Sequence, residues 1–321
     1  MRRVSIIGGR ELTLLTACVL VAAVASAASP YFATVDNLST VLRNSVELMI
    51  IGLGMTLLLA MGGIDVSIGM VLGLAALAAG ALVGAGYGPL LPIFAGPLVG
   101  ALLGLLTGAV VVLGGIPPIV GTLGLLGVYR AAIFLLLRGR WLSGLPPSLT
   151  NILSSSLLGV PLAAIVIAVI YLAVWLALRH TPYGPHLLAI GADEEKARLS
   201  GVAVRRVRIA TFLLSGLLAG IAAVFYVSTY RNVAMTVGGN IALEAIAAAV
   251  LGGTSITGGG CSLLGTALGA ILIRLLQNGL VLVGVPSLWQ TVVTGALLLL
   301  VLSGEAIRAR LAIPRLFWRP S

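Results

Sequence analysis

The sequence predicts an all-α, polytopic membrane protein with about ten transmembrane helices and both termini in the cytoplasm. Three properties of the 321-residue chain support this fold class: 60% of its residues are hydrophobic, only 9% are charged, and its mean hydropathy is +1.17. A soluble domain averages roughly 25% charged residues. Ten helices of about 20 residues each would use about 200 residues and leave the rest for loops. This composition excludes a soluble enzyme, a disordered chain and a nucleic-acid-binding domain.

Apolar runs bounded by charges or by glycine and proline clusters define the expected spans. The first run follows three arginines and resembles a secretory signal peptide. Nine further spans need no cleaved signal, so we expect this run to remain as a helix. A broken or re-entrant pair within 62–86 would change the count to nine or eleven. The expected spans are 11–29, 46–62, 67–85, 90–114, 117–138, 158–178, 208–229, 241–256, 262–283 and 287–303.

The positions of the basic residues predict the orientation of these spans. Cytoplasmic loops of membrane proteins are enriched in Lys and Arg, so the formal net charge of +10 indicates topology rather than a nucleic-acid partner. With the N-terminus inside, thirteen basic residues fall on the cytoplasmic side, in the N-terminus, the 179–208 loop and the C-terminal tail. Four fall outside, namely Arg43, Arg138, Arg140 and Arg231. This asymmetry requires an even number of spans.

The sequence carries no motif for nucleotide hydrolysis or for another catalytic centre. The P-loop pattern GxxxxGK[ST] is absent, and the only lysine, Lys196, follows three acidic residues in a loop. The patterns HExxH and GxSxG are absent too. Cys18 and Cys261 lie beside or inside apolar runs, so we expect neither a disulfide nor a metal site. We therefore expect a protein that is not an enzyme, with any ATPase supplied by a second chain.

A glycine-rich break at 62–69 contains one of the few ionisable residues near the spans. Asp65 and Ser67 lie in this break, between two apolar runs. Asp65 could cap the following helix through its side-chain oxygen, with Ser67 assisting. Alternatively, Asp65 could act directly in gating or in contact with a substrate.

Arg130, Glu244 and Arg274 also fall within or at the edge of expected spans. Charges at this depth cost several kcal/mol and normally face a cavity or one another. Glu244 and Arg130 could neutralise each other or line a path. Arg274 and Asn278 are four residues apart and share a helix face, which predicts either a pore lining or hydrogen bonds between helices.

Glycine spacing predicts close contact between helices. Gly96, Gly100, Gly104 and Gly108 form three consecutive GxxxG steps in one expected span. Small residues at this spacing let helix backbones approach closely in lipid. Close packing is the simpler interpretation, and sliding surfaces for alternating access are the other.

The longest cytoplasmic segment, 184–208, contains a predicted short helix at 194–200. Asp193 is suited to the N-cap, Glu194 and Glu195 favour the first turn, and Gly201 is suited to the C-terminal end. A helix of this length is unstable alone, so a partner or the rest of the chain would have to hold it. A solvated basic loop is the alternative.

At these segments the chain resembles the membrane permeases of bacterial ribose-type ABC importers. Residues 62–69 match the family's Gly-Gly-Ile-Asp-(Leu/Val)-Ser-(Val/Ile)-Gly element. Residues 191–202 match its cytoplasmic coupling helix, which ends in Ala-Arg-Leu-Ser-Gly-(Ile/Val). Residues 244–255 match a third run, with one residue fewer after the glutamate, and 278–280 and 284–286 match a later Asn-Gly-Leu followed by Gly-Val-Pro. Within the family, 115–130 and 141–146 look most like autoinducer-2 import permeases, with rhamnose permeases second.

The resemblance implies one subunit of a larger machine in a bacterial inner membrane. Two permeases, identical or paralogous, would combine with two ATPases that bind ATP and magnesium, and a periplasmic binding protein would deliver the solute. Residues 1–321 would form a single transmembrane permease domain, with 184–208 as its coupling loop. Contact with the ATPase would be made by Asp193, Glu194, Glu195, Ala197, Arg198, Leu199, Ser200 and Gly201. The translocation path or gate would include Asp65, Ser67, Arg130, Glu244, Arg274 and Asn278.

The resulting functional hypothesis is ATP-driven import of a small, neutral, polyhydroxylated solute such as autoinducer-2, rhamnose or ribose. Few charges in the spans agree with a neutral cargo. The alternative is an ion-coupled secondary transporter in which Asp65 or Glu244 binds the coupling ion. An intramembrane enzyme is a third class, for which the sequence offers no assembled site.

Overall fold

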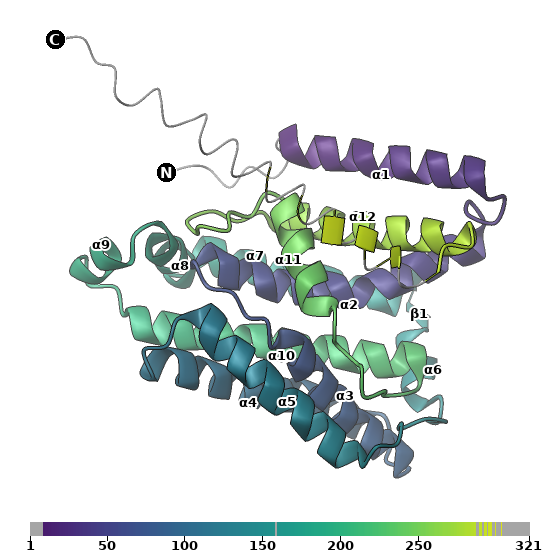
Figure 1. Ribbon diagram of the computed structural model, residues 1–321, viewed down its shortest axis with the longest axis horizontal. Helices are drawn as coiled ribbons and strands as arrows, with labels where there is room; N and C mark the ends of the chain where they lie inside the picture. Colours follow the sequence, from purple (N-terminus) through teal and green to yellow (C-terminus); the bar gives the residue numbers. More distant parts are fainter. Residues whose placement is uncertain are drawn as a thin grey trace, which may run out of the picture.

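In the computed structural model the described part of the chain is mostly helical (Figure 1). The structure describes residues 9–157 and 159–286, together with positions 289, 290, 292, 293, 295, 296, 299 and 303. Within that part of the chain, seven helices are long and apolar enough to cross a membrane. They are α1 (Gly9–Ala28), α2 (Val35–Ala60), α4 (Leu90–Leu113), α5 (Pro118–Leu137), α7 (Leu162–His180), α10 (Val204–Tyr230) and α12 (Leu263–Leu282).

Two further apolar helices are shorter, and the remaining elements are small. The shorter apolar helices are α3 (Ile68–Gly84) and α11 (Ile241–Leu251). α11 runs steeply across the direction of α2, α10 and α12 (Figure 1). Neither helix is long enough to cross a membrane by the length of its regular part alone. The small elements are α6 (Ser148–Leu153), the antiparallel pair β1 (Ser156–Leu157) and β2 (Val160–Pro161), α8 (Tyr183–Ala192) and α9 (Glu194–Leu199).

Nine of the expected spans coincide with described helices, and the tenth, 287–303, lies almost wholly outside the described residues. The largest boundary error concerns α2, which begins at Val35 rather than at residue 46. The hydroxyl of Thr34 accepts a hydrogen bond from the Asn37 backbone N–H at 3.3 Å, and Asp36 lies in the first turn. This polar N-terminal cap was not recognised because Asp36 and Arg43 interrupt the apolar run. The helix α6, the β1–β2 hairpin and α8 were not predicted.

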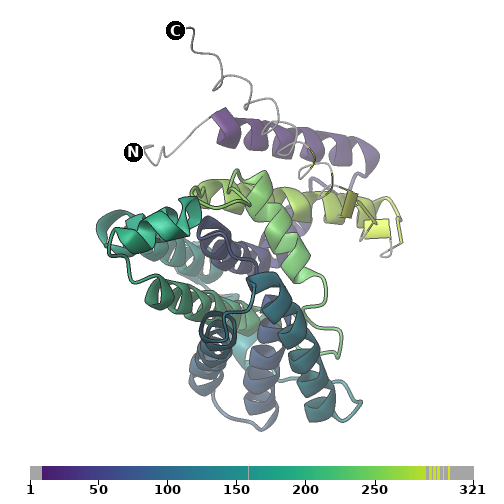
Figure 2. The ribbon, with the colours of Figure 1, turned by 60° about the vertical axis from the view of Figure 1, so that its left-hand side comes forward.

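The core of the protein forms around α2 and α10. Nearly every residue of α2 from Ser45 to Ala60 is buried, whereas no residue of α7 is. A second, smaller apolar cluster joins α1 to α12 and includes Leu14, Cys18, Leu272 and Leu275. Figures 1 and 2 show α1 beside α12 at the edge of the molecule, away from α4 and α10. α2 is therefore the central helix against which the other layers are packed.

The predicted GxxxG steps form the contact between α4 and α10. A Cβ atom on Gly104 would lie 2.8 Å from the Cα of Gly216, and one on Gly100 would lie 2.7 Å from the Cα of Gly220. A Cβ on Gly108 would lie 2.8 Å from the Cβ of Phe212. Real Cβ atoms do not approach so closely, so the two backbones can touch only because these positions are glycine. Close packing is therefore the interpretation that the structure supports.

The loops gather at two opposite ends of the helices. α8 and α9 lie at one end with the start of α10, and α6 and β1 lie at the other end with the C-terminal part of α10 (Figure 1). At the second end, Leu142 and Val233 form an isolated antiparallel bridge. The Arg231 Nε atom donates a hydrogen bond to the Leu145 carbonyl at 2.8 Å. The long loops that follow α5 and α10 are thereby tied together.

We predict that Gly104→Val destabilises the protein by about 2–3 kcal/mol, because the added side chain forces α4 away from α10. The check is the midpoint of thermal unfolding of the purified permease in detergent. Leu102→Val is the matched control, since Leu102 is 57% exposed on the same helix. Equal midpoints for the two variants would contradict the proposed importance of the glycine contact.

Candidate coupling helix and intramembrane polar sites

α9 matches the short helix predicted in the cytoplasmic loop, and its N-cap is the predicted Asp193. The Asp193 Oδ1 atom accepts a hydrogen bond from the Lys196 backbone N–H at 3.0 Å, and Oδ2 pairs with Lys196 Nζ at 2.8 Å. These hydrogen bonds with Lys196 hold the pKa of Asp193 below its usual value. Gly201 follows the C-cap residue Ser200 with a φ of +84°, a conformation that favours glycine.

The body of the protein holds one side of α9 and leaves the other side exposed. Ala197 is buried, and Glu194 pairs with Arg208 of α10 at 2.9 Å. In contrast, the side chains of Glu195 and Arg198 are 75% and 70% exposed, and Leu199 is 79% exposed. Glu195 and Arg198 pair with each other at 3.8 Å, and Leu199 follows them on the exposed side. An exposed leucine beside an exposed ion pair is a surface suited to contact with another protein.

A junction of backbones joins the end that carries α8 and α9 to the long helices. The Gly259 N–H donates a hydrogen bond to the Ala60 carbonyl, the last residue of α2, at 3.0 Å. A Cβ on Gly191 of α8 would collide with that same carbonyl and would lie 2.5 Å from the Gly259 nitrogen. Gly258 has a φ of +89°, and a Cβ there would collide with the Gly191 carbonyl. We call the contact of Ala60, Gly191, Gly258 and Gly259 the glycine junction.

Asp65 and Ser67 lie close together at the start of α3. Asp65 is 3% exposed, and its Oδ1 atom accepts hydrogen bonds from the Ser67 backbone N–H at 2.7 Å and from the Ser67 hydroxyl at 2.6 Å. The N-cap position is Ser67, so Asp65 organises the start of the helix from two residues further back. Thr122 of α5 contacts the same turn, because its hydroxyl accepts a hydrogen bond from Val66 N–H at 3.3 Å. Asp65 is therefore not the N-cap of α3, as one of the two predictions had it, but its side chain binds the N-cap residue, Ser67.

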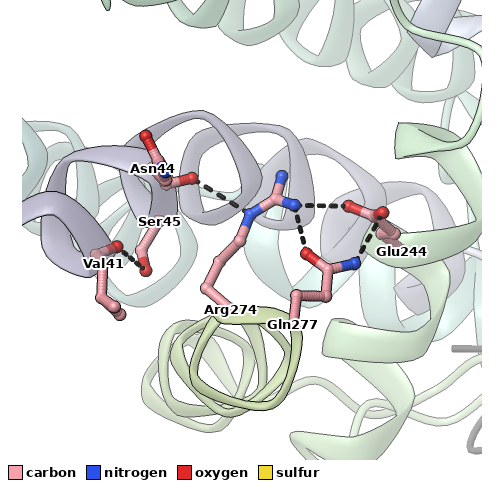
Figure 3. A network of polar contacts seen from close by, with 6 residues as sticks. All are labelled: Val41, Asn44, Ser45, Glu244, Arg274 and Gln277. Carbon is pink, nitrogen blue, oxygen red and sulfur yellow. Dashed lines mark hydrogen bonds and ion pairs between the residues drawn. The ribbon is translucent and has the colours of Figure 1, made fainter. Parts of the chain in front are cut away.

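Glu244 pairs with Arg274, not with Arg130 (Figure 3). The Glu244 Oε2 atom lies 3.1 Å from Arg274 Nη1, and Gln277 Nε2 donates to Glu244 Oε1 at 3.0 Å. Arg274 also donates from Nη1 to Gln277 Oε1 at 2.6 Å and from Nε to the Asn44 carbonyl of α2 at 3.1 Å. The group joins α2, α11 and α12 and is largely withdrawn from solvent, with Arg274 17% and Glu244 13% exposed.

The suggestion that Glu244 and Arg130 neutralise each other was wrong. Arg130 lies two-thirds of the way along α5 and is exposed, and no ion pair involves it among the described residues. The sequence could not reveal this, since Glu244 and Arg274 meet only through the packing of α11 on α12.

Asn278 forms an amide pair with Asn37 across α12 and α2. Each side-chain nitrogen donates to the other residue's oxygen at 2.9 Å. The polar stripe of Arg274 and Asn278 therefore makes hydrogen bonds between helices in this structure, one of the two predicted possibilities.

Glu47 is a buried ionisable residue of α2 that the sequence analysis did not single out. It is 3% exposed on α2, and its Oε1 atom has no hydrogen-bond partner. The expected span began at residue 46, which placed Glu47 at a helix end. Because α2 starts at Val35, Glu47 lies near the middle of the helix instead. The sequence feature that could have identified Glu47 is a single acidic residue followed directly by an uninterrupted apolar run.

The comparisons with known proteins agree that the chain is similar to transport permeases. The model of the family described as branched-chain amino acid transport system / permease component matches residues 37–302. The chain is similar to the ribose import permease protein of Escherichia coli (strain K12), with 34% identity over 298 residues, covering 89% of this chain and 90% of the relative. It is also similar to the autoinducer 2 import system permease protein of Klebsiella pneumoniae subsp. pneumoniae, with 37% identity over 308 residues, 95% of this chain and 89% of the relative. No solved structure matches the chain.

We predict that Glu244→Gln and Arg274→Gln each destabilise the purified permease by about 3 kcal/mol, because each leaves a largely buried charge without its partner. The double variant should lose less than the sum of the two, which a thermodynamic cycle measured by denaturant unfolding would show. Arg130→Gln is the control and should change the unfolding free energy by less than about 0.5 kcal/mol. Strictly additive losses for the Glu244 and Arg274 variants would contradict the ion pair.

Proposed function

The chain belongs to the branched-chain amino acid transport system / permease component family, and on this premise we propose that it is the membrane subunit of an importer for a small, neutral, polyhydroxylated solute. The observation that carries the proposal is its similarity, along 86–95% of its length, to permeases named for ribose and for autoinducer 2 import. The protein is a multi-pass component of a bacterial inner membrane and a transport subunit rather than an enzyme. ATP is hydrolysed by a separate ATPase subunit.

The proposed topology has ten spans with both termini in the cytoplasm. The end that carries α8 and α9 holds most of the described basic loop residues and would face the cytoplasm. The end with α6 and the β1–β2 hairpin would face the periplasm and the solute-binding protein. Residues 1–321 would then form one permease domain with 184–208 as its cytoplasmic coupling loop.

The exposed side of α9 would be the docking surface for the ATPase, which binds ATP and magnesium itself. Glu195, Arg198 and Leu199 would make the contact, while Asp193, Glu194, Ala197, Ser200 and Gly201 keep α9 in shape and in place. Closure of the ATPase would move α9 and α8 together, and the glycine junction would pass the movement to α2 and to the turn before α12. Such coupling shifts the balance between inward-open and outward-open states.

A second permease, identical or paralogous, would cover the exposed face of α5. An arginine in the middle of a membrane helix is costly in lipid and normally faces protein or a water-filled cavity. On α5, Arg130 shares its exposed side with Gly127 and with Phe134, which is 56% exposed. A Cβ on Gly127 would meet nothing within 4 Å, so a neighbouring helix can approach there. Contact with the second permease would enclose Arg130 beside a path between the two subunits.

The solute would pass along a path that includes Asp65, Ser67, Arg130, Glu244, Arg274 and Asn278. A neutral cargo agrees with the local pairing of these groups, since the charge of Glu244 is taken up by Arg274 and that of Asp65 by hydrogen bonds. The relatives' names favour this ATP-driven importer over an ion-coupled transporter that uses Asp65 or Glu244. Branched-chain amino acids, named in the family's description, are the second candidate cargo.

The test is uptake into vesicles that contain the permease together with its ATPase, supplied with the loaded binding protein encoded beside it. Ribose, autoinducer 2 and leucine, each radiolabelled, distinguish the two classes of cargo. Uptake of ribose or autoinducer 2 that requires ATP supports the proposal. Uptake of leucine alone, or uptake driven by an ion gradient without ATP, contradicts it.

We predict that replacing Glu195 and Arg198 together by alanine lowers ATP-dependent uptake at least tenfold, because the docking surface on α9 is lost. The amount of ATPase that co-purifies with the permease should fall as well, while the thermal unfolding midpoint of the permease stays within 2–4 °C of the original, as expected for exposed side chains. Arg43→Ala is the control, since this exposed arginine lies in the half of α2 remote from α9. Unchanged uptake and unchanged ATPase binding in the double variant would show that α9 is not the coupling helix.

A further inference from the structure

The ion pair between Glu194 of α9 and Arg208 of α10 joins two helices that otherwise touch only lightly. The Arg208 Nη2 atom lies 2.9 Å from Glu194 Oε2. The Nε atom of the same arginine is buried and has no hydrogen-bond partner among the described residues. A buried donor left without a partner costs about 1–3 kcal/mol. The position of this guanidinium is therefore explained by its contact with Glu194 and not by the stability of α10 alone.

This pair differs from the other ion pairs of α9 in what it connects. Among the described residues, those other pairs join side chains three positions apart, Asp193 with Lys196 and Glu195 with Arg198. They shape α9 and its exposed side but attach it to nothing else. The Glu194–Arg208 pair is also the better shielded one at its far end, since the Arg208 side chain is only 24% exposed. It is the ion pair through which α9 is tied to a long helix.

α8 is attached to the same side of α10 close by. The hydroxyl groups of Tyr183, the first residue of α8, and Thr211 of α10 lie 2.9 Å apart. Thr211 is fully buried and follows Arg208 by three positions, so both residues lie on one face of α10. We call these two contacts, Tyr183 with Thr211 and Glu194 with Arg208, the polar clamp. The first residue of α8 and the first residue of α9 are thus both fixed to the beginning of α10.

α10 leads from the polar clamp to the closest helix contact of the protein. The helix runs from Val204 to Tyr230 without a proline, and Gly216 lies eight residues after Arg208, about 12 Å at 1.5 Å per residue. At Gly216 and Gly220 the backbone of α10 touches that of α4. The clamp therefore connects α9 to the pair of α10 and α4, whereas the glycine junction connects α8 to α2.

We propose that Arg208 is a positioning residue for import, which carries the movement of α9 to α10 and α4 through its ion pair with Glu194. This inference rests on the proposed function and adds a second route of coupling beside the glycine junction. Arg208 touches neither the ATPase surface of α9 nor the solute. A charge-assisted hydrogen bond suits this role, because it fixes the distance and direction between two groups where an apolar contact could slide.

We expect Arg208→Gln to lower the amount of solute moved per ATP hydrolysed about fivefold, the upper end of what a partly exposed ion pair contributes. The assay is uptake into vesicles that contain the permease and its ATPase, supplied with the loaded binding protein. The amount of ATPase that co-purifies with the permease should stay the same, because Glu195, Arg198 and Leu199 remain in place. Arg208→Lys keeps the charge and should retain most of the original ratio.

Two further variants show whether the pair is responsible. Glu194→Gln should give the same loss as Arg208→Gln, and the two changes together should lose no more than either alone, because both remove one contact. Arg205→Gln is the matched control. Arg205 is exposed in the first turn of α10 and takes part in no ion pair among the described residues, so its variant should behave as the original protein.

Three results would count against these assignments, and they can be told apart. An unchanged ratio of solute to ATP in Arg208→Gln, or losses that multiply in the double variant, would overturn the coupling role and leave the importer function intact. Loss of the co-purifying ATPase in Arg208→Gln would also overturn it, since the pair would then serve only to hold α9 in place for docking. Failure of the original protein to take up ribose or autoinducer 2 with ATP would instead contradict the proposed function.

Discussion

Backbone contact through glycine is the constraint on which this structure depends. In lipid no hydrophobic force drives helices together, so their association relies on close fit and on hydrogen bonds. The contact of α4 with α10 is possible because glycines face glycines along both helices. The glycine junction uses the same principle at the end that carries α8 and α9, where three separate segments meet at the Ala60 carbonyl. Tight packing and coupling between segments therefore come from one type of contact.

Polar groups inside the spans follow a second rule, which is that nearly all of them are satisfied within the protein. Asn37 and Asn278 bond to each other, Asp65 binds Ser67, and Glu244 and Arg274 form an ion pair. Among the described residues of the spans, three buried side-chain atoms depart from this pattern because they have no hydrogen-bond partner: Glu47 Oε1, Arg208 Nε and Ser215 Oγ. Arg130 departs from it in another way, since it is exposed in mid-helix. Under the proposed function, a second permease would cover the exposed side of Arg130.

Hydropathy and capping patterns predicted the local features well. The nine described apolar helices and the helix that begins after Asp193 follow from apolar runs and cap residues, which depend only on neighbouring positions. The start of α2 was missed because Asp36 and Arg43 break the apolar run without breaking the helix. The partner of Glu244 could not be predicted, because Arg274 reaches it only when α11 packs on α12. Glu47 was overlooked for a related reason. The expected span began at residue 46, whereas α2 begins at Val35, which places Glu47 near the middle of the helix.

The continuity of α2 gives the glycine junction a mechanical meaning. Ala60 and Glu47 belong to one helix without proline and are about 20 Å apart, at 1.5 Å per residue. Between them, Gly52 and Gly54 are braced against Thr266 and Ser215, so the helix is supported where it would bend most easily. α2 is therefore expected to move as one rigid element. A helix supported in this way would carry a displacement applied at Ala60 along its length to Glu47.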